Sequence, residues 1–250
     1  MRGLKDKRVL ITGGASGIGA VTAARFLAEG AQVIVFDRDA AGCQRLRQQN
    51  PTLTETVIAN VARYEEVVEA FQKIDQLWGG LDVLINNAGI SIPHAFTEIT
   101  PDAWQEVVGV NLNGVFFVAQ QAAIRMRASS GGVIINMGSV SGMVGIPNYA
   151  DYNATKAGVI ELTRTMALEL APTVRVVAVC PGYVLTPMQA AEYTPEMIAA
   201  VNAKIPLRRH ATPAEIAALF AFLASEEAPF ITGSAIVIDG GESAGGLASR

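Results

Sequence analysis

The sequence predicts one α/β domain, built on a doubly wound parallel sheet of about seven strands with helices on both faces. Short runs rich in valine and isoleucine alternate with segments of helical spacing along almost the whole chain. Runs that are apolar on both faces are typical of a parallel sheet buried between two helical layers. A glycine-rich turn follows the first run, and no linker or repeat divides the 250 residues, half of which are hydrophobic. One domain over residues 1–250 is therefore expected.

The predicted elements follow one another without long gaps. The strands are expected at residues 8–12, 32–37, 55–60, 81–87, 132–138, 174–180 and 234–241. Three helix starts are marked by a threonine that caps and a proline that takes the first helical position. These begin at Thr100, Thr194 and Thr212, and Glu215 gives the last one the spacing of a capping box. The longest helices are expected over 101–128 and 153–170.

Composition argues against several classes of protein. A formal net charge of −4 and a pI near 5.3 disfavour nucleic acid or an anionic membrane as partner, because no basic field would attract phosphates. Mean hydropathy is +0.32, yet no apolar run approaches the roughly 18 residues of a membrane span. No signal-peptide segment precedes the first strand, and Cys43 and Cys180 are the two cysteines, so a cytoplasmic protein with reduced, inert thiols is expected. Two histidines offer no cluster for a metal site.

The turn after the first strand has the pattern of a phosphate-binding loop. Its glycines would let the backbone approach a pyrophosphate, and the following helix would offer free N–H groups and the positive end of its dipole. The residues expected to bind the cofactor there are Gly13, Ser16, Gly17, Ile18 and Gly19.

Asp37 ends the second strand, 18 residues after Gly19. A carboxylate at this point accepts hydrogen bonds from the adenine ribose hydroxyls. It would also repel a 2′-phosphate, so NAD(H) is preferred over NADP(H). Arg38 follows directly, and it either softens that rejection or is a solvated surface charge.

Tyr152 and Lys156 are spaced i and i+4, which on a helix places both side chains on one face. A neighbouring ammonium, helped by the positive nicotinamide of an oxidised cofactor, favours the phenolate, so the pair can act as an acid and base. Lowering a tyrosine pKa from about 10 to about 7 requires roughly 4 kcal/mol. Tyr149 has Asn153 four residues on instead of a lysine, and it is interpreted as packing or substrate contact.

The chain resembles the classical short-chain dehydrogenase/reductase family over nearly its whole length. The resemblance rests on six motifs in the family's order: "TGGASGIG" at 12–19, "NNAG" at 86–89, "NLNG" with Asn111, "NMGSVSG" with Ser139, "YNATK" at 152–156 and "PGYVLTPM" at 181–188. It implies a Rossmann-type domain that transfers a hydride between a nicotinamide and an alcohol or ketone carbon. Tyr152 would be the acid/base, Lys156 would tune it and bind the nicotinamide ribose, Ser139 would orient the substrate oxygen, and Asn111 would hold a water that relays protons.

The resemblance also places residues around the cofactor and substrate. Further cofactor contacts are expected from Asn60, Val61, Asn87, Ala88, Gly89, Pro181, Gly182, Val184 and Thr186. Asn60 stands where relatives commonly carry an aspartate facing adenine, a contact that its carbonyl oxygen could still make. A substrate lid is expected around 186–207, with Tyr193 and Met197 suggesting an apolar pocket. Candidate pocket residues are His94, Ser141, Met143, Tyr149, Tyr183 and Met188, with Ser141 the lesser candidate for the role given to Ser139.

The sequence thus favours an NAD-dependent alcohol dehydrogenase or ketone reductase acting on a small molecule, assembled as a homotetramer or homodimer as the family usually is. Two alternatives remain open at this point. One is a reductase of 3-oxoacyl groups on acyl carrier protein that uses NADPH, against which Asp37 argues. The other is a catalytically silent dinucleotide-binding sensor on the same fold, which an intact Ser139–Tyr152–Lys156 set disfavours.

Overall fold

The computed structural model describes residues 1–186 and 193–245, and its centre is one parallel sheet with the strand order β3-β2-β1-β4-β5-β6-β7. This confirms the predicted fold class. The strands are β1 (Arg8–Thr12), β2 (Gln32–Asp37), β3 (Glu55–Ile58), β4 (Val83–Asn86), β5 (Gly132–Met137), β6 (Val174–Pro181) and β7 (Ala235–Ile238).

Strand order determines where a ligand can bind. The chain builds β1, β2 and β3 towards one edge and then crosses to β4, which pairs with the other side of β1. The loops that leave β1 and β4 therefore turn away from each other, and a crevice opens at the carboxyl ends of these two strands. The glycine turn and the "NNAG" segment lie at this switch point.

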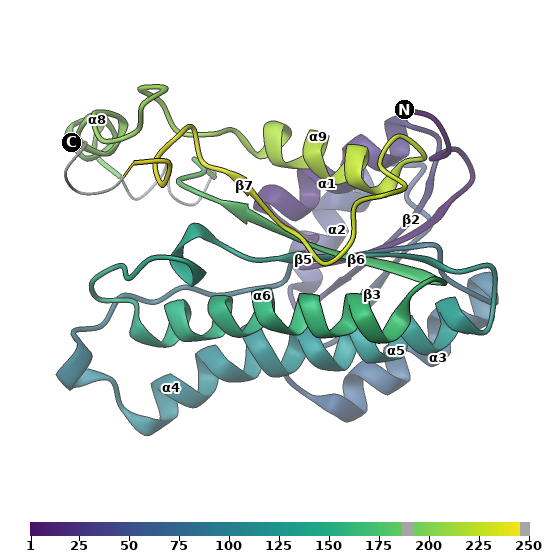
Figure 1. Ribbon diagram of the computed structural model, residues 1–250. Helices are drawn as coiled ribbons and strands as arrows, with labels where there is room; N and C mark the ends of the chain where they lie inside the picture. The colour runs from purple at the N-terminus through teal and green to yellow at the C-terminus, as the bar shows by residue number, and fades with distance from the viewer. Residues whose placement is uncertain (187–192, 246–250) are drawn as a thin grey trace.

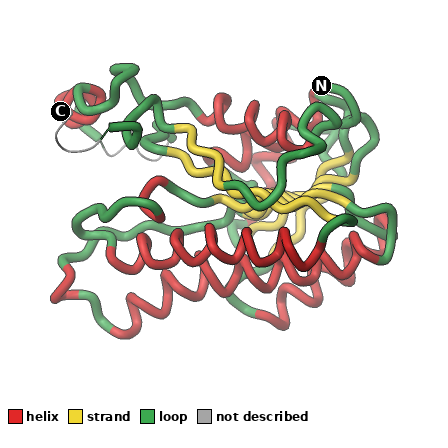
Figure 2. Tube along the Cα trace, viewed as in Figure 1, coloured by secondary structure: helices red, strands yellow, loops and turns green. Residues whose placement is uncertain are grey.

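Helices cover the two faces of the sheet in separate layers (Figure 1). One layer contains α1 (Gly17–Ala28), α2 (Ala40–Gln49) and α9 (Pro213–Ala224), and its core includes Phe26 and Phe220. The other contains α3 (Tyr64–Trp78), α5 (Val115–Arg127) and α6 (Ala150–Leu170), around Phe71 and Met126. Figure 2 shows the strands enclosed between these two helical layers. Burial on both sides explains why the strand sequences are apolar at nearly every position.

The three predicted caps are confirmed. The Thr100 side chain accepts a hydrogen bond from Ala103 N–H at the start of α4 (Pro101–Val108), and the Thr194 side chain accepts one from Met197 N–H at the start of α8 (Pro195–Asn202). At Thr212 both halves of the capping box with Glu215 are present.

The long helix expected over 101–128 is interrupted. Between α4 and α5 the turn Gly109–Gly114 is π-helical, and Asn111 lies inside it. By length and composition alone, the stretch Pro101–Arg127 could cross a membrane, because an 18-residue segment of it has a mean hydropathy of 1.4. However, 56% of that segment is buried within the protein. Packing of α5 against β4, β5, α3 and α6 accounts for that apolar character. The helix expected over 153–170 begins earlier, at Ala150.

Candidate active site

The glycine turn between β1 and α1 adopts a backbone shape that requires glycine. Gly13 and Gly17 have φ values of +64° and +54°, in the left-handed region, and a Cβ at Gly19 would lie 2.2 Å from the carbonyl oxygen of Gly13. A Cβ at Gly17 would meet only Thr186, at 3.8 Å. The start of α1 is thus a cradle formed by bare backbone. Ser16 is the N-cap, and its side chain makes no capping hydrogen bond. Ile18 is partly buried in the first turn. This geometry fits the pyrophosphate of a dinucleotide.

Asp37 is fixed beside this cradle by two backbone donors. Its Oδ2 accepts a hydrogen bond from Ala15 N–H at 2.9 Å, and its Oδ1 accepts one from Asp39 N–H at 3.0 Å. Asp39 adds a second carboxylate, which pairs with Arg45 at 3.5 Å. Arg38 is exposed. The neighbourhood of the predicted ribose site is therefore acidic.

Thr12 joins the glycine turn to the end of β4, a role that the sequence did not reveal. Its Oγ1 accepts hydrogen bonds from Asn87 N–H and Ala88 N–H, both at 3.0 Å. Asn87 Nδ2 in turn donates to the carbonyl oxygens of Thr12 and Gly13 at 3.0 and 3.1 Å. The two strand ends that flank the switch point are thus held together by side chains.

A row of buried polar side chains continues from Thr12 across the sheet. The Thr12 hydroxyl donates to Asn86 Oδ1 at 3.4 Å, Asn86 Nδ2 donates to Asn136 Oδ1 at 3.2 Å, and Asn136 Nδ2 donates to Thr163 Oγ1 at 2.9 Å. All four residues are at most 1% exposed. The row links β1, β4 and β5 to α6, the helix that carries Tyr152.

Ser139 and Tyr152 come together although 13 positions separate them. Ser139 follows β5 with an extended backbone and is buried, and its hydroxyl accepts a hydrogen bond from Ser141 N–H at 3.1 Å. The Ser139 side chain lies close enough to the phenol of Tyr152, in the first turn of α6, to lower the pKa of that phenol. Ser141 therefore supports Ser139 through its backbone.

Lys156 lies one turn further along α6 and is 2% exposed. Its Nζ donates a hydrogen bond to the carbonyl oxygen of Met137 at 2.8 Å and stands 5.4 Å from the centre of the Tyr152 ring. Burial disfavours the ammonium and lowers its pKa from 10.5 to about 8. The i, i+4 spacing thus brings the two groups together as predicted, while the ammonium bonds to a backbone carbonyl.

In the protein without cofactor the pKa of Tyr152 is raised, whereas the lowered pKa expected from the sequence required an oxidised nicotinamide as well as Lys156. Burial of the phenol raises its pKa above 10, and the Ser139 side chain opposes this only in part. The sequence argument counted the lysine but could not include desolvation, which depends on the whole tertiary structure. The phenol of the protein alone is consequently a proton donor.

Asn111 anchors the loop that follows β4. Its Oδ1 accepts from Ile90 N–H and its Nδ2 donates to the Ile90 carbonyl oxygen, both at 2.8 Å. Nδ2 is also 3.5 Å from the Thr155 hydroxyl, and the side chain is fully buried. The predicted water relay stays a prediction, and the side chain itself is occupied by Ile90.

Cys180 lies beneath Ser139 and is fully buried at the end of β6. A Cβ at Gly138 would come within 2.7 Å of its Sγ, so the absence of a side chain there lets the thiol pack closely. Burial raises the pKa of the Cys180 thiol to about 11, which keeps it protonated at neutral pH. Its nearness to the site was not expected from the sequence.

The remaining predicted cofactor residues line the same edge of the sheet. A Cβ at Gly89 would lie 3.3 Å from Asn111 Oδ1 and 3.6 Å from Lys156 Nζ. Asn60 Oδ1, expected to face adenine, already accepts a hydrogen bond from Ala62 N–H at 3.0 Å. Val61 is buried against Gly114. Beyond β6, Gly182 N–H donates to Ile238, Val184 forms a bridge with Ala211, and Thr186 N–H donates to Val184.

The predicted substrate residues that the structure describes come from the segments that follow β4, β5 and β6. Tyr149 packs edge-on against Tyr152, with ring centres 6.3 Å apart, and Tyr183 follows β6. Met143 is 43% exposed, and the backbone N–H of His94 binds the Asn148 carbonyl oxygen at 2.8 Å. Met188 and part of the predicted lid over 186–207 lie outside the described residues.

Comparison with known proteins places this geometry among oxidoreductases. Residues 13–243 match a family model described as enoyl-(acyl carrier protein) reductase. The chain is 40% identical to a 3-oxoacyl-[acyl-carrier-protein] reductase of Thermotoga maritima, over 95% of this chain and 98% of the relative. It is 38% identical to 3beta-hydroxysteroid dehydrogenase 1 of Eggerthella lenta, over 95% and 94%. The crystal structure of a 3-ketoacyl-(acyl-carrier-protein) reductase from Brucella melitensis in complex with NADH superposes with a TM-score of 0.89 at 35% identity, covering 96% of this chain and 99% of that one.

Proposed function

Because the chain belongs to the short-chain dehydrogenase/reductase family, we propose that it is an NAD(H)-dependent enzyme that interconverts a secondary alcohol and a ketone. The observation that carries this proposal is the gathering of Ser139, Tyr152 and Lys156 beside a glycine cradle. A bound nicotinamide would supply or accept the hydride. The protein's own residues then have to bind the substrate oxygen and move one proton.

In the direction of reduction, the phenol of Tyr152 donates its proton to the carbonyl oxygen as that oxygen gains negative charge. Burial suits this step, because it keeps the phenol protonated until a charge develops near it. The hydroxyl of Ser139 donates a second hydrogen bond to the same oxygen and stabilises the charge. Lys156 is close enough to stabilise the phenolate that remains.

In the direction of oxidation, Tyr152 must first lose its proton. The protein alone opposes this, so the positive charge of an oxidised nicotinamide and of Lys156 has to favour the phenolate. The raised pKa of Tyr152 therefore predicts that oxidation becomes faster as pH rises above neutral, whereas reduction does not.

The proposal is tested by following NADH absorbance with a panel of secondary alcohols, sugars, steroids, diols and ketones. Turnover of at least one class, with release of the matching ketone or alcohol, is expected. Binding of NADH without turnover anywhere in the panel would instead support a silent dinucleotide-binding protein.

We further propose that NAD(H) is preferred over NADP(H) because Asp37 presents a carboxylate where a 2′-phosphate would lie. Asp37→Asn keeps the shape of the side chain and, with its amide oxygen towards Ala15 N–H, that hydrogen bond, while it removes the charge and the bond from Asp39 N–H. The ratio of kcat/KM for NADH over NADPH should fall by about tenfold or more in this variant, since one charge repulsion is lost.

Asp39→Asn is the matched control, because Asp39 is half exposed and already paired with Arg45, and it should change the ratio less. A wild-type protein that prefers NADPH, or a ratio that Asp37→Asn leaves unchanged, would contradict the assignment.

A second candidate is the reduction of a 3-oxoacyl group on acyl carrier protein. It is favoured by the names of the Thermotoga relative and of the Brucella structure, which is a complex with NADH. Offering the same 3-oxoacyl substrate with NADH and with NADPH separates the two candidates. Faster turnover of an acyl carrier thioester than of any free ketone would favour this second function.

A further inference from the structure

Tyrosines gather around the catalytic one. The chain has five tyrosines, and all except Tyr64 lie at the same end of the sheet. We call Tyr149, Tyr183 and Tyr193 the phenol wall. They come from three separate segments: the residue before α6, the loop after β6, and the residue before the cap of α8.

The members of the phenol wall are close to one another and to Tyr152. Tyr149 contacts the Tyr152 ring edge-on, at 6.3 Å between centres and 66° between planes. Tyr193 lies near enough to Tyr149 to raise the pKa of Tyr149, and both lie near enough to Tyr183 to raise the pKa of Tyr183. All three side chains are partly buried.

The backbone under the wall is fixed by hydrogen bonds. Asn148, next to Tyr149, accepts from His94 N–H at 2.8 Å, and Asn153 Nδ2 donates to the Ile146 carbonyl oxygen at 2.9 Å. The Tyr183 carbonyl oxygen accepts from Ala211 N–H at 2.9 Å. Phenols held in this way lose little freedom when a ligand binds them.

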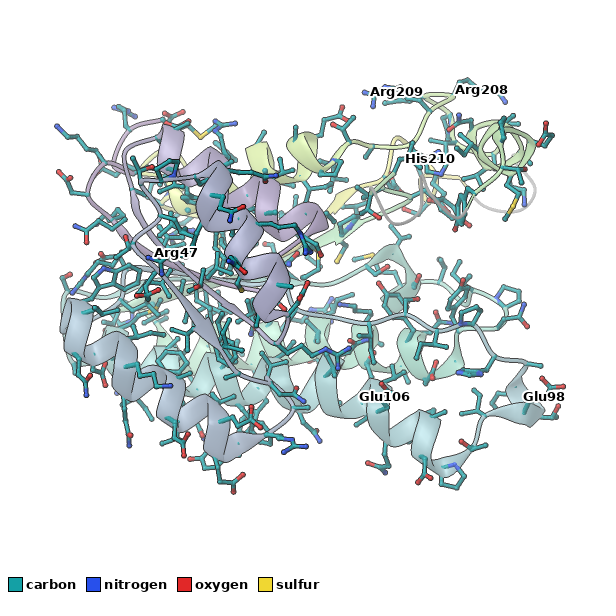
Figure 3. All side chains as sticks on the ribbon, turned by 180° about the vertical axis from the view of Figure 1, so that it is seen from behind. Arg47, Glu98, Glu106, Arg208, Arg209 and His210 are labelled. Carbon is teal, nitrogen blue, oxygen red and sulfur yellow. The ribbon has the colours of Figure 1, made fainter. Side chains whose placement is uncertain are left out.

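His210 supports Tyr183 from the side of the predicted lid. Figure 3 shows it near Arg208 and Arg209, in the segment between α8 and α9. Its ring meets Tyr183 edge-on at 5.8 Å, and its Nδ1 is 2.7 Å from Asn202 Oδ1 at the end of α8. The ring is 6% exposed, and its Nε2 has no hydrogen-bond partner in the part of the chain that the structure describes. Beside Tyr183, His210 Nε2 is thus one polar atom without a partner among the described residues.

The side chains of Tyr149 and Tyr183 are partly buried, and their hydroxyls remain available to a ligand. Burial raises the pKa of Tyr149 and of Tyr183, and within residues 1–186 and 193–245 no hydrogen bond from a protein group opposes that rise. A protonated phenol in such a place can donate a hydrogen bond to a ligand oxygen and accept one from a ligand hydroxyl. Met143 and Val144, in the segment between Ser139 and Tyr149, are apolar side chains that are 43% and 45% exposed.

We propose that the phenol wall binds a second oxygen of the substrate, so that the substrates are diols and hydroxyketones with a hydrocarbon frame. The inference rests on the proposed alcohol–ketone function of the same site. One oxygen of the substrate meets Ser139 and Tyr152. The other, one or two carbons away, meets the hydroxyl of Tyr149 or Tyr183, and the adjacent methionine and valine contact the carbon frame.

The test compares matched substrates that differ by one hydroxyl: 2-butanol with 2,3-butanediol, and cyclohexanol with 1,2-cyclohexanediol. After allowance for the two reacting carbons of each diol, kcat/KM for the diol should exceed that for the mono-alcohol by about tenfold. Tyr149→Phe and Tyr183→Phe each remove only a hydroxyl, and the double variant should reduce this preference to about one- to threefold. Tyr64→Phe, on the exposed start of α3, is the control and should leave the preference at its wild-type value.

The outcomes separate the two proposals. Turnover of mono-alcohols and diols with equal kcat/KM would overturn the role of the phenol wall and leave the alcohol–ketone function standing. A diol preference that survives in the double variant would also overturn it. Absence of turnover with every alcohol and ketone would contradict the proposed function itself, and with it the wall.

Discussion

Replacing Tyr152 by phenylalanine is expected to reduce kcat about a thousandfold. The variant keeps the aromatic ring and its packing against Tyr149, but it removes the proton that must reach the substrate oxygen. General acid–base catalysis by one positioned group typically contributes about 10²- to 10⁴-fold. The loss should appear mainly in kcat, because the glycine cradle and Asp37 that would bind the dinucleotide are untouched.

The measurement is steady-state turnover with the best substrate of the panel, together with NADH binding by fluorescence titration. NADH should bind with an affinity within about threefold of the wild-type value, since Tyr152 is one contact among many. Tyr64→Phe provides a control for the loss of a phenol elsewhere in the chain. If Tyr152→Phe keeps more than a few per cent of wild-type turnover, the proton must come from another group.

Replacing Lys156 by methionine should reduce activity strongly while leaving the fold as stable as before or more so. The ammonium is buried among uncharged groups, and this lowers its pKa to about 8. At pH 7 the folded protein therefore bears the cost of a buried charge. Methionine fills similar volume without that cost, and the loss of the bond to Met137 offsets part of the gain. We expect the free energy of unfolding to rise by about 2 kcal/mol at pH 7, and kcat to fall about a hundredfold.

The pH dependence gives a sharper test of the same variant. Between about pH 8 and pH 10.5 the folded wild-type protein has lost the Lys156 proton while the unfolded chain still binds it. Stability contributed by this group therefore increases with pH across that window. The stability advantage of Lys156→Met should shrink over the same range, as followed by urea unfolding at several pH values.

Lys73→Met, at an exposed position of α3, is the control and should show no such trend. A Lys156→Met protein that is less stable than the wild type at pH 7 would show that the ammonium is stabilising where it lies.

The features that could be predicted from the sequence are those that depend on residues close together along the chain. The threonine–proline caps specify three helix starts by themselves, and all three occur. The i, i+4 spacing brings Lys156 to Tyr152 because any α-helix would do so. The glycine turn followed by Asp37 needs only a strand, a turn and a helix, and the dinucleotide cradle lies where these three elements place it.

What the sequence missed depends on residues that are far apart along the chain. The pKa of Tyr152 is raised mainly by burial, and two residues from other elements act on it in opposite directions, Ser139 lowering it and Cys180 raising it. The π-helical turn at Asn111 exists together with bonds to Ile90, 21 positions away. Thr12 looks like an ordinary strand residue until Asn87 and Ala88 lie beside it.

The polar row through Thr12, Asn86 and Asn136 also has a consequence for how the chain assembles. The three residues are direct lateral partners in the sheet, Thr12 opposite Asn86 and Asn86 opposite Asn136. If β4 slipped by one residue, the Asn86 side chain would point to the other face and lose both neighbours inside an apolar core. A buried amide without a partner costs about 1–3 kcal/mol, and a shifted β4 would lose the side-chain hydrogen bonds to both β1 and β5. The row therefore disfavours any sheet in which β4 pairs in a shifted register. The correct register is then in place before the glycine turn and Ser139 are brought to the same edge of the sheet.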